Sequence, residues 1–384
     1  MKAIRTKESA LTDGKLISSD SHIVEPPDVW AERLDAKYRD RAPRVVAEHD
    51  GDWWIVDGVR TNSFQGGAQA GVRFESQDRL RPAARFNEVR RGAYDPAEFL
   101  KENESDGIYG SVLYPTEGLQ LFRVPDVDLL TAVFRAYNDW LGEFCRTNPR
   151  RLKGIAMLNV EDVPTAIREL ERTRKAGLAG AMITVYPPEE VGYDHPQYEP
   201  LWAAAQDLDA PLALHVDTNR PQRGALEETM RNRRPSSLAN ADHWVRMSLG
   251  HIILTGVFER YPRLRIGSAE HELSWAPHFI DRLDYTYTQR ARRESWYRFK
   301  GDARPSDFFH RNAFLSFQED GLGIRDRGLI GVDTLMWGSD YPHTESTFPQ
   351  SRKILERILD GVPDDERRKI TRDNAARLYE FEIG

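Results

Sequence analysis

Short apolar runs alternate with helical patterns along most of the chain. Within 126–147, Leu130, Val133, Phe134 and Tyr137 recur at steps of three and four residues, which predicts a helix with one apolar face. Short apolar runs without this spacing predict buried strands. We expect eight strands, at 15–22, 111–115, 152–158, 180–186, 211–216, 264–270, 313–317 and 334–340.

Helical patterns lie between the predicted strands. We expect helices at 96–106, 126–147, 162–176, 197–208, 238–260, 274–290, 322–330, 349–360 and 363–380. Apolar strands that alternate with amphipathic helices are typical of a parallel sheet covered by helices. Eight such units predict a (β/α)8 TIM barrel in the α/β class. An open doubly wound sheet is the alternative, but no glycine-rich phosphate loop follows the first strand.

The segment 28–95 interrupts this alternation. Residues 52–60 form two short strand-like pieces around Asp57-Gly58, a dipeptide typical of a hairpin turn. We therefore expect a single barrel domain over 1–384, with 28–95 inserted after the first strand. This insertion is either a lid over the tip of that strand or a decoration without a role in the site. Residues 1–14 are expected to form a loose polar arm.

Composition narrows the range of partners. The chain has 384 residues, 40% hydrophobic and 30% charged, with a net charge of −7, which indicates a globular protein without a basic surface for nucleic acid or an anionic membrane. No apolar run approaches the ~20 residues of a membrane-spanning helix. Residues 1–14 lack the apolar core of a signal peptide. We expect a cytoplasmic protein that acts on a small molecule.

Acidic residues and histidines stand at the ends of several predicted strands. The first strand ends in Asp-Ser-His, and because side chains alternate along a strand, its acid and its histidine share one face. Each residue alone has an ordinary structural explanation, a capping acid or a hydrogen-bonded core histidine. The carboxyl ends of all barrel strands meet at one mouth, however, so their convergence predicts a divalent metal site or proton-transfer chemistry. The residues are Asp20, His22, His215, Glu270, His271 and Asp340.

These motifs resemble those of the amidohydrolase superfamily, in particular the amidohydrolase-related branch that includes aminocarboxymuconate-semialdehyde decarboxylase. The resemblance spans about 15–380 and rests on four pieces: Asp20-Ser21-His22 with Glu25-Pro26, Leu214-His215, the turn 256–262, and the stretch 338–343. It implies a metal bound by Asp20, His22, His215 and Asp340, with His271 as a second-metal ligand or a proton-transfer residue. It also implies a homo-oligomer.

Two departures from the superfamily pattern affect the expected metal. Many members begin with His-x-His, whereas this chain has Asp20 and His22, and acids flank His271 on both sides, at Glu270 and Glu272. The fourth strand supplies no lysine or glutamate that could bridge two metals, so a second ion would need Glu270, Glu25 or a hydroxide as its bridge. A site rich in carboxylates favours iron or manganese over zinc, with one or two ions per chain.

The leading functional prediction is hydrolysis of an amide, ester or thioester by metal-bound hydroxide. Glu270 or His271 would carry the proton to the leaving group, and Asp340 would act as both ligand and base. The alternative is metal-dependent, non-oxidative decarboxylation of a small or aromatic carboxylic acid. A barrel that only binds a ligand or partner is a third hypothesis, disfavoured because all four ligand positions are intact. The residues expected to contact substrate are His343, Tyr114 and Trp275.

Overall fold

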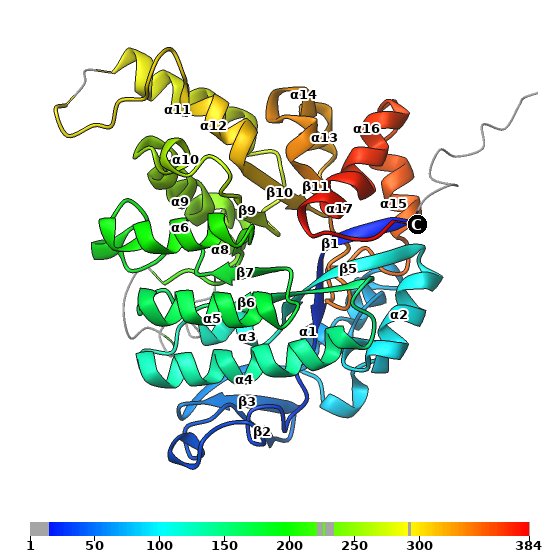
Figure 1. Cartoon of the computed structure of the whole chain (residues 1–384). Helices are drawn as coiled ribbons and strands as arrows, with labels where there is room; N and C mark the ends of the chain where they lie inside the picture. The colour runs from blue at the N-terminus through cyan, green and yellow to red at the C-terminus, as the bar shows by residue number, and fades with distance from the viewer. Residues whose placement is uncertain (1–14, 221–225, 227–233, 291–292, 384) are drawn as a thin grey trace, which may run out of the picture.

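Eight parallel strands form the centre of the molecule in a computed structural model that describes residues 15–220, 226, 234–290 and 293–383 (Figure 1). The predicted arm at 1–14 lies outside these residues. Each strand pairs in parallel with the next in chain order, which confirms the (β/α)8 barrel. The strands are β1 (Leu16–Ile23), β5 (Ile108–Pro115), β6 (Leu152–Met157), β7 (Gly180–Ile183), β8 (Leu212–His215), β9 (Ile266–Ala269), β10 (Ala313–Phe317) and β11 (Leu335–Trp337).

The barrel closes between β1 and the residues that follow β11. The Asp340 N–H donates to the Asp20 carbonyl at 2.8 Å, and the His22 N–H donates to the Tyr341 carbonyl at 2.7 Å. Both bonds lie at the carboxyl end of the barrel. They therefore hold the end of the first strand beside the loop that follows the last one.

Helices cover the outside of the barrel (Figure 1). Among the described helices, four begin at an aspartate whose side chain accepts a backbone N–H of the first turn, which is the usual helix-start signal. These residues are Asp95, Asp126, Asp162 and Asp320. These helices include α2 (Pro96–Ser105), α4 (Val127–Arg146), α5 (Val163–Lys175), α6 (Glu199–Asp207), α11 (Ala276–Gln289) and α15 (Ser351–Ile358).

Some predicted helices are interrupted. The helix expected at 238–260 consists of α8 (Pro235–Ala239), α9 (Asp242–Leu254) and α10 (Val257–Arg260), and Gly256 separates the last two at φ 75°. Glycine is common at helix ends because, without a Cβ, it adopts the left-handed backbone conformation at little steric cost. The stretch 363–380 likewise contains α16 (Asp364–Arg368), a π-helical turn and α17 (Asn374–Leu378), and 322–330 contains α13 (Gly321–Arg325) and α14 (Arg327–Ile330). The short helices α3 (Gly118–Leu121) and α12 (Pro305–Asn312) were not expected.

The inserted segment forms an antiparallel sheet of β2 (Arg44–Ala47), β3 (Asp52–Val56) and β4 (Val59–Ser63), followed by the short helix α1 (Gln65–Ala68). The expected hairpin at Asp57-Gly58 is present, with φ values of 49° and 80°. Strand β2 was not predicted. The ring of Trp54 packs edge-on to Trp30, with ring centroids 5.1 Å apart, and the Trp30 indole donates to the Val133 carbonyl on α4. The insertion thus shares the core of the barrel.

Of the helices in the described part of the chain, none is long and apolar enough to cross a membrane.

Candidate metal centre

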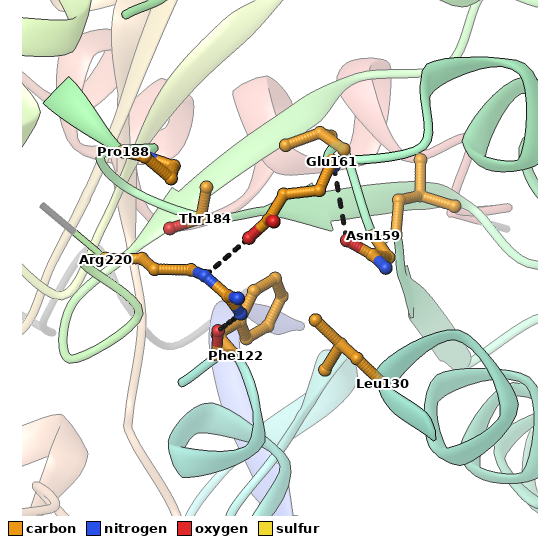
Figure 2. A pocket seen from close by; sticks show the side chains of 9 residues that line it. Phe122, Leu130, Asn159, Glu161, Thr184, Pro188 and Arg220 are labelled. Atoms are coloured by element: carbon orange, nitrogen blue, oxygen red, sulfur yellow. Dashed lines mark hydrogen bonds and ion pairs between the residues drawn. The ribbon is translucent and has the colours of Figure 1, made fainter. Parts of the chain in front are cut away.

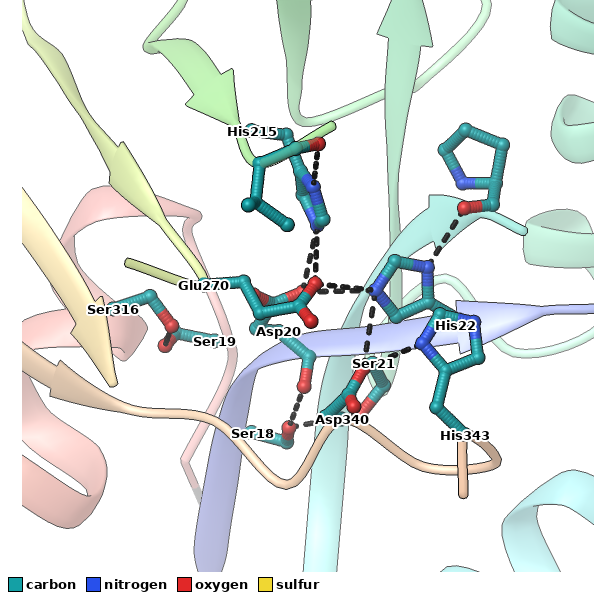
Figure 3. A network of polar contacts seen from close by, with 12 residues as sticks. Ser18, Ser19, Asp20, Ser21, His22, His215, Glu270, Ser316, Asp340 and His343 are labelled. Carbon is teal, nitrogen blue, oxygen red and sulfur yellow. Dashed lines mark hydrogen bonds and ion pairs between the residues drawn. The ribbon is translucent and has the colours of Figure 1, made fainter. Parts of the chain in front are cut away.

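Side chains from β1 and β8, and from the residues that follow β9 and β11, converge at the mouth of the barrel (Figure 3). Ligand atoms of one group lie within 4.8 Å of one another, and so do those of a second, overlapping group. The first group is Asp20, His22, His215 and Glu270, and the second is His22, Glu270, Asp340 and His343. The structure therefore brings together Asp20, His22, His215, Glu270 and Asp340, as the strand-end pattern predicted.

The distances describe side chains that surround a common centre. His22 Nε2 lies 3.3 Å from Asp340 Oδ1 and 3.5 Å from Asp20 Oδ1, while His215 Nε2 lies 3.5 Å from both Asp20 Oδ1 and Glu270 Oε2. These separations exceed ordinary hydrogen-bond lengths. Among the described residues, neither oxygen of Asp20, nor Oδ2 of Asp340, nor either Nε2 atom has a hydrogen-bond partner.

Backbone carbonyls orient both histidines. His22 Nδ1 donates to the Pro115 carbonyl at 2.7 Å, and His215 Nδ1 donates to the Val216 carbonyl at 3.1 Å. A carbonyl oxygen only accepts, so Nδ1 carries the proton and the Nε2 lone pair faces the centre. Buried carboxylates and imidazole lone pairs without protein partners are costly unless a cation binds them. The donor set therefore fits a divalent metal ion.

The carboxylates of the centre influence one another strongly. Burial, and then the nearby Asp340 and Asp20 carboxylates, raise the pKa of Glu270 well above its ordinary value. For Asp20, burial raises the pKa, but attraction to the His215 and His22 rings outweighs it and the pKa lies below its ordinary value. A cation among these acids would relieve their mutual repulsion.

The backbone at the mouth adopts unusual conformations. Glu270 and Asp340 have φ values of 61° and 58°, and Asp217, two residues after β8, has a φ of 64°. Non-glycine residues rarely adopt this left-handed region, and such positions cluster at functional sites. Gly338 is required beside them, because a Cβ there would lie 2.5 Å from the Cβ of Asp20.

His343 belongs to the same cluster. Its Nδ1 lies 2.8 Å from Asp340 Oδ1, its Nε2 lies 3.1 Å from Thr116 Oγ1, and its ring stacks on His22 with centroids 3.9 Å apart. The side chain thus braces Asp340 and His22. Its predicted contact with substrate stays a prediction.

A serine network under the centre was not expected from the sequence. Ser18 Oγ donates to the Asp20 carbonyl at 2.8 Å, and Ser19 Oγ lies 2.7 Å from Ser316 Oγ (Figure 3). Ser18 Oγ also accepts from the Ser339 N–H at 2.8 Å. The network joins β1 to β10 and β11. The only signal in the sequence was the unusual serine content of a buried strand.

Three other predicted site residues lie at different places. His271 belongs to neither group of ligand atoms; its Nδ1 lies 3.0 Å from Ser268 Oγ, and burial lowers its pKa to about 3. The ring of Tyr114 lies against that of His215, with centroids 4.9 Å apart. The Trp275 indole donates to the Glu272 carbonyl at 3.0 Å. The roles predicted for these side chains stay predictions.

A second polar group lies between the loops that follow β6 and β8 (Figure 2). Arg220 pairs with Glu161 at 2.5 Å and donates to the carbonyls of Phe122 and Val124, both at 2.7 Å. The cavity beside this pair has room for about one water molecule. We interpret this buried ion pair as a structural brace between the loops.

Comparisons with known proteins assign the chain to a family. The family model described as Amidohydrolase matches residues 95–381. The chain belongs to the amidohydrolase family. This confirms the resemblance seen in the sequence motifs. The inserted segment lies almost wholly outside the matched residues.

Individual relatives of this amidohydrolase are aromatic-acid decarboxylases by name. The gamma-resorcylate decarboxylase of Rhizobium sp. strain MTP-10005 is 26% identical over 283 residues, which cover 67% of this chain and 79% of the relative. A solved amidohydrolase from Mycobacterium avium subsp. paratuberculosis K-10 has a TM-score of 0.75 at 20% identity and covers 96% of this chain and 98% of its own. A dihydroxybenzoic acid decarboxylase from Polaromonas sp. JS666 was solved with manganese and the inhibitor 2-nitroresorcinol. It has a TM-score of 0.63 at 18% identity, and the match covers 97% of this chain and 98% of the decarboxylase.

Proposed function

We propose that this amidohydrolase is a metal-dependent, non-oxidative decarboxylase of an aromatic carboxylic acid. The observation that carries the proposal is the convergence of carboxylate and imidazole ligand atoms at the barrel mouth, in a chain whose relatives are named as gamma-resorcylate decarboxylases. The leading prediction from the sequence, hydrolysis of an acyl bond, finds no support among these relatives. Their names favour the alternative reading instead.

We assign Asp20, His22, His215 and Asp340 as the residues that hold the metal. Manganese is the ion we favour, because the set contains two carboxylates and because the Polaromonas decarboxylase was solved with manganese. The two groups of ligand atoms share His22 and Glu270, so one ion per chain fits them better than two. When bound, the cation supplies positive charge that orients and polarises the oxygen atoms of the substrate.

Glu270 is the acid that we assign to proton transfer. Its side chain is 19% exposed, whereas Asp20 and Asp340 are each 1% exposed, so Glu270 is the carboxyl that an arriving substrate meets. Burial, the largest cause of its raised pKa, does not depend on the cation and favours the protonated form, which can act as a donor. In the reaction the ring–carboxyl bond breaks, its electron pair stays on the ring carbon and carbon dioxide leaves. Glu270 then gives its proton to that carbon and regains one from water.

Release of carbon dioxide from gamma-resorcylate by the manganese-loaded protein tests the proposal. We expect the Asp340→Asn variant to lose both bound manganese and turnover, because it removes a charged ligand. The Glu270→Gln variant should keep the metal and lose turnover by about 100-fold or more.

The control is Glu272→Gln. Glu272 is a neighbouring acid that accepts the backbone N–H groups of Gln318 and Glu319, both at 3.2 Å, instead of reaching the centre. This variant should retain turnover. Hydrolysis of aryl esters without any release of carbon dioxide from aromatic acids would overturn the decarboxylase assignment and restore the hydrolase prediction.

A further inference from the structure

Two side chains mark the side from which the metal centre can be reached. Glu270 is 19% exposed and His343 is 15% exposed, whereas the other members of the two groups are 1% exposed or less. A ligand that enters the centre must therefore pass beside Glu270 or His343. The residues around His343 then decide how much room the ligand has.

The inserted segment supplies the wall on the His343 side. Thr344 Oγ1, one residue after His343, donates to the Gly66 carbonyl of α1 at 3.3 Å. Arg73 donates to the Ser346 carbonyl at 2.9 Å and pairs with Glu319 at 2.9 Å. These contacts attach the segment to the loops that follow β10 and β11, so it forms a fixed wall over this part of the mouth.

Two adjacent glycines in this wall, Gly66 and Gly67, differ in how much space their neighbours leave for a side chain. A Cβ on Gly67 would overlap the side chain of Val24, so packing explains that glycine. Among the described residues, a Cβ on Gly66 would meet only His343 Cδ2, at an ordinary contact distance of 3.9 Å. Gly66 is also not among the positive-φ residues, so its backbone suits any amino acid. Neither packing nor conformation requires a glycine at 66.

We propose that Gly66 keeps open the space beside His343 that the ring of the substrate occupies, so that the inserted segment sets which aromatic acids the centre accepts. This inference rests on the proposed function. A larger side chain at 66 would fill the space, and the anchored wall could not move aside to restore it. Specificity would then lie in a segment almost wholly outside the part of the chain that the family model matches.

The first experiment measures binding of 2-nitroresorcinol to the manganese-loaded protein. We expect affinity to fall from wild type to Gly66→Ala and further to Gly66→Val, by about tenfold or more for valine, with the manganese content unchanged. The matched control is Gly328→Val, on the exposed surface of α14, where a Cβ meets no atom within 4 Å. It should bind the ligand as wild type does. Wild-type affinity in the Gly66→Val variant would overturn the inference.

A second experiment separates failure of this inference from failure of the proposed function. Cys145 is the only cysteine, and it is buried with its pKa raised by burial to about 12, so a thiol at another position can be labelled selectively. A nitroxide on the Gly66→Cys variant should be broadened strongly by bound Mn²⁺, and one on Gly328→Cys only weakly. If wild type binds no 2-nitroresorcinol, the aromatic-acid proposal fails, while strong broadening still supports Gly66 as part of the wall. Equal broadening at both positions would refute that placement.

Discussion

At the scale of single residues, the buried carboxylates of this protein differ in what neutralises them. Glu25 accepts the backbone N–H groups of Glu117 and Gly118 at 2.9 and 3.0 Å, which replace the water lost on burial. In the described part of the chain, no backbone N–H donates to a side-chain oxygen of Asp20 or Asp340. Because backbone donors neutralise Glu25 but not Asp20 or Asp340, the side chains of Asp20 and Asp340 are arranged to bind a cation.

Asp106 offers a test of residue-scale electrostatics away from the centre. Burial raises its pKa from 3.8 to about 6, although Ser351 donates to it from its backbone N–H at 3.1 Å and from its hydroxyl. Between these two values the folded protein binds a proton that the unfolded chain does not, so the contribution of Asp106 to stability falls as pH rises from about 4 to about 6. The full difference is roughly 3 kcal/mol.

The Asp106→Asn variant should remove this dependence, because an amide does not titrate. Relative to wild type, we expect its free energy of unfolding in urea to increase by roughly 3 kcal/mol between pH 4 and pH 7. Asp302→Asn, which removes the same charge from an exposed position, serves as the control. Parallel stability curves for wild type and Asp106→Asn would contradict the prediction.

At the scale of elements, β1 and the inserted segment position the site. Strand β1 carries Asp20 and His22, and its serines bond to β10 and β11. The insertion is joined to the loop after β5 as well, because Thr61 Oγ1 on β4 donates to the buried Glu117 carboxyl at 2.5 Å. Burial raises the pKa of Glu117 well above its ordinary value. The hydrogen bond from Thr61 therefore stabilises a polar group that has lost its water.

Replacing Thr61 with valine should weaken this junction. The change keeps the shape of the side chain and leaves Glu117 Oε1 without its donor, at a cost of about 1–3 kcal/mol in the free energy of unfolding. Urea unfolding measures the effect. Thr288→Val, which removes a hydroxyl bonded within its own exposed helix turn, should change stability much less. An equal decrease in the free energy of unfolding in both variants would show that the Thr61–Glu117 hydrogen bond does not stabilise the fold more than an exposed one does.

At the scale of the whole molecule, the metal centre and the closure of the barrel are one structure. The same stretches, around Asp20 and Asp340, form the closing backbone bonds and carry two buried carboxylates of the metal centre. Repulsion between these acids opposes closure when no cation is present. A bound ion would therefore stabilise the entire fold.

Manganese should accordingly raise the stability of the protein. At a free concentration of about 100 times its Kd, an ion that binds only the folded state adds about 2.7 kcal/mol, or roughly 3 °C in Tm for a chain of this size. Thermal unfolding with and without Mn²⁺ measures the shift. The Asp20→Asn variant should show little of it, and Asp302→Asn should show all of it. A rise of the same size in Asp20→Asn would place the stabilising ion elsewhere.

The sequence by itself determined the barrel and most of the candidate metal centre. Apolar periodicity located all eight barrel strands, and Asp20, His22, His215 and Asp340 stood at their carboxyl ends. This was sufficient because parallel strands in a barrel direct their carboxyl ends to one mouth. Local pattern also found the Asp-Gly hairpin, because that turn depends on two adjacent residues.

Only the tertiary structure decided which neighbours of these residues join the centre. Glu270 lies with His22 and His215 in one group of ligand atoms, whereas the adjacent His271 does not. Glu270 has a left-handed backbone conformation, which directs its side chain toward the centre and which the sequence alone does not predict. The stacking of His343 on His22 and the approach of Gly66 to His343 join segments that are far apart in sequence. Such contacts depend on how the insertion packs against the mouth, and no local periodicity encodes that packing.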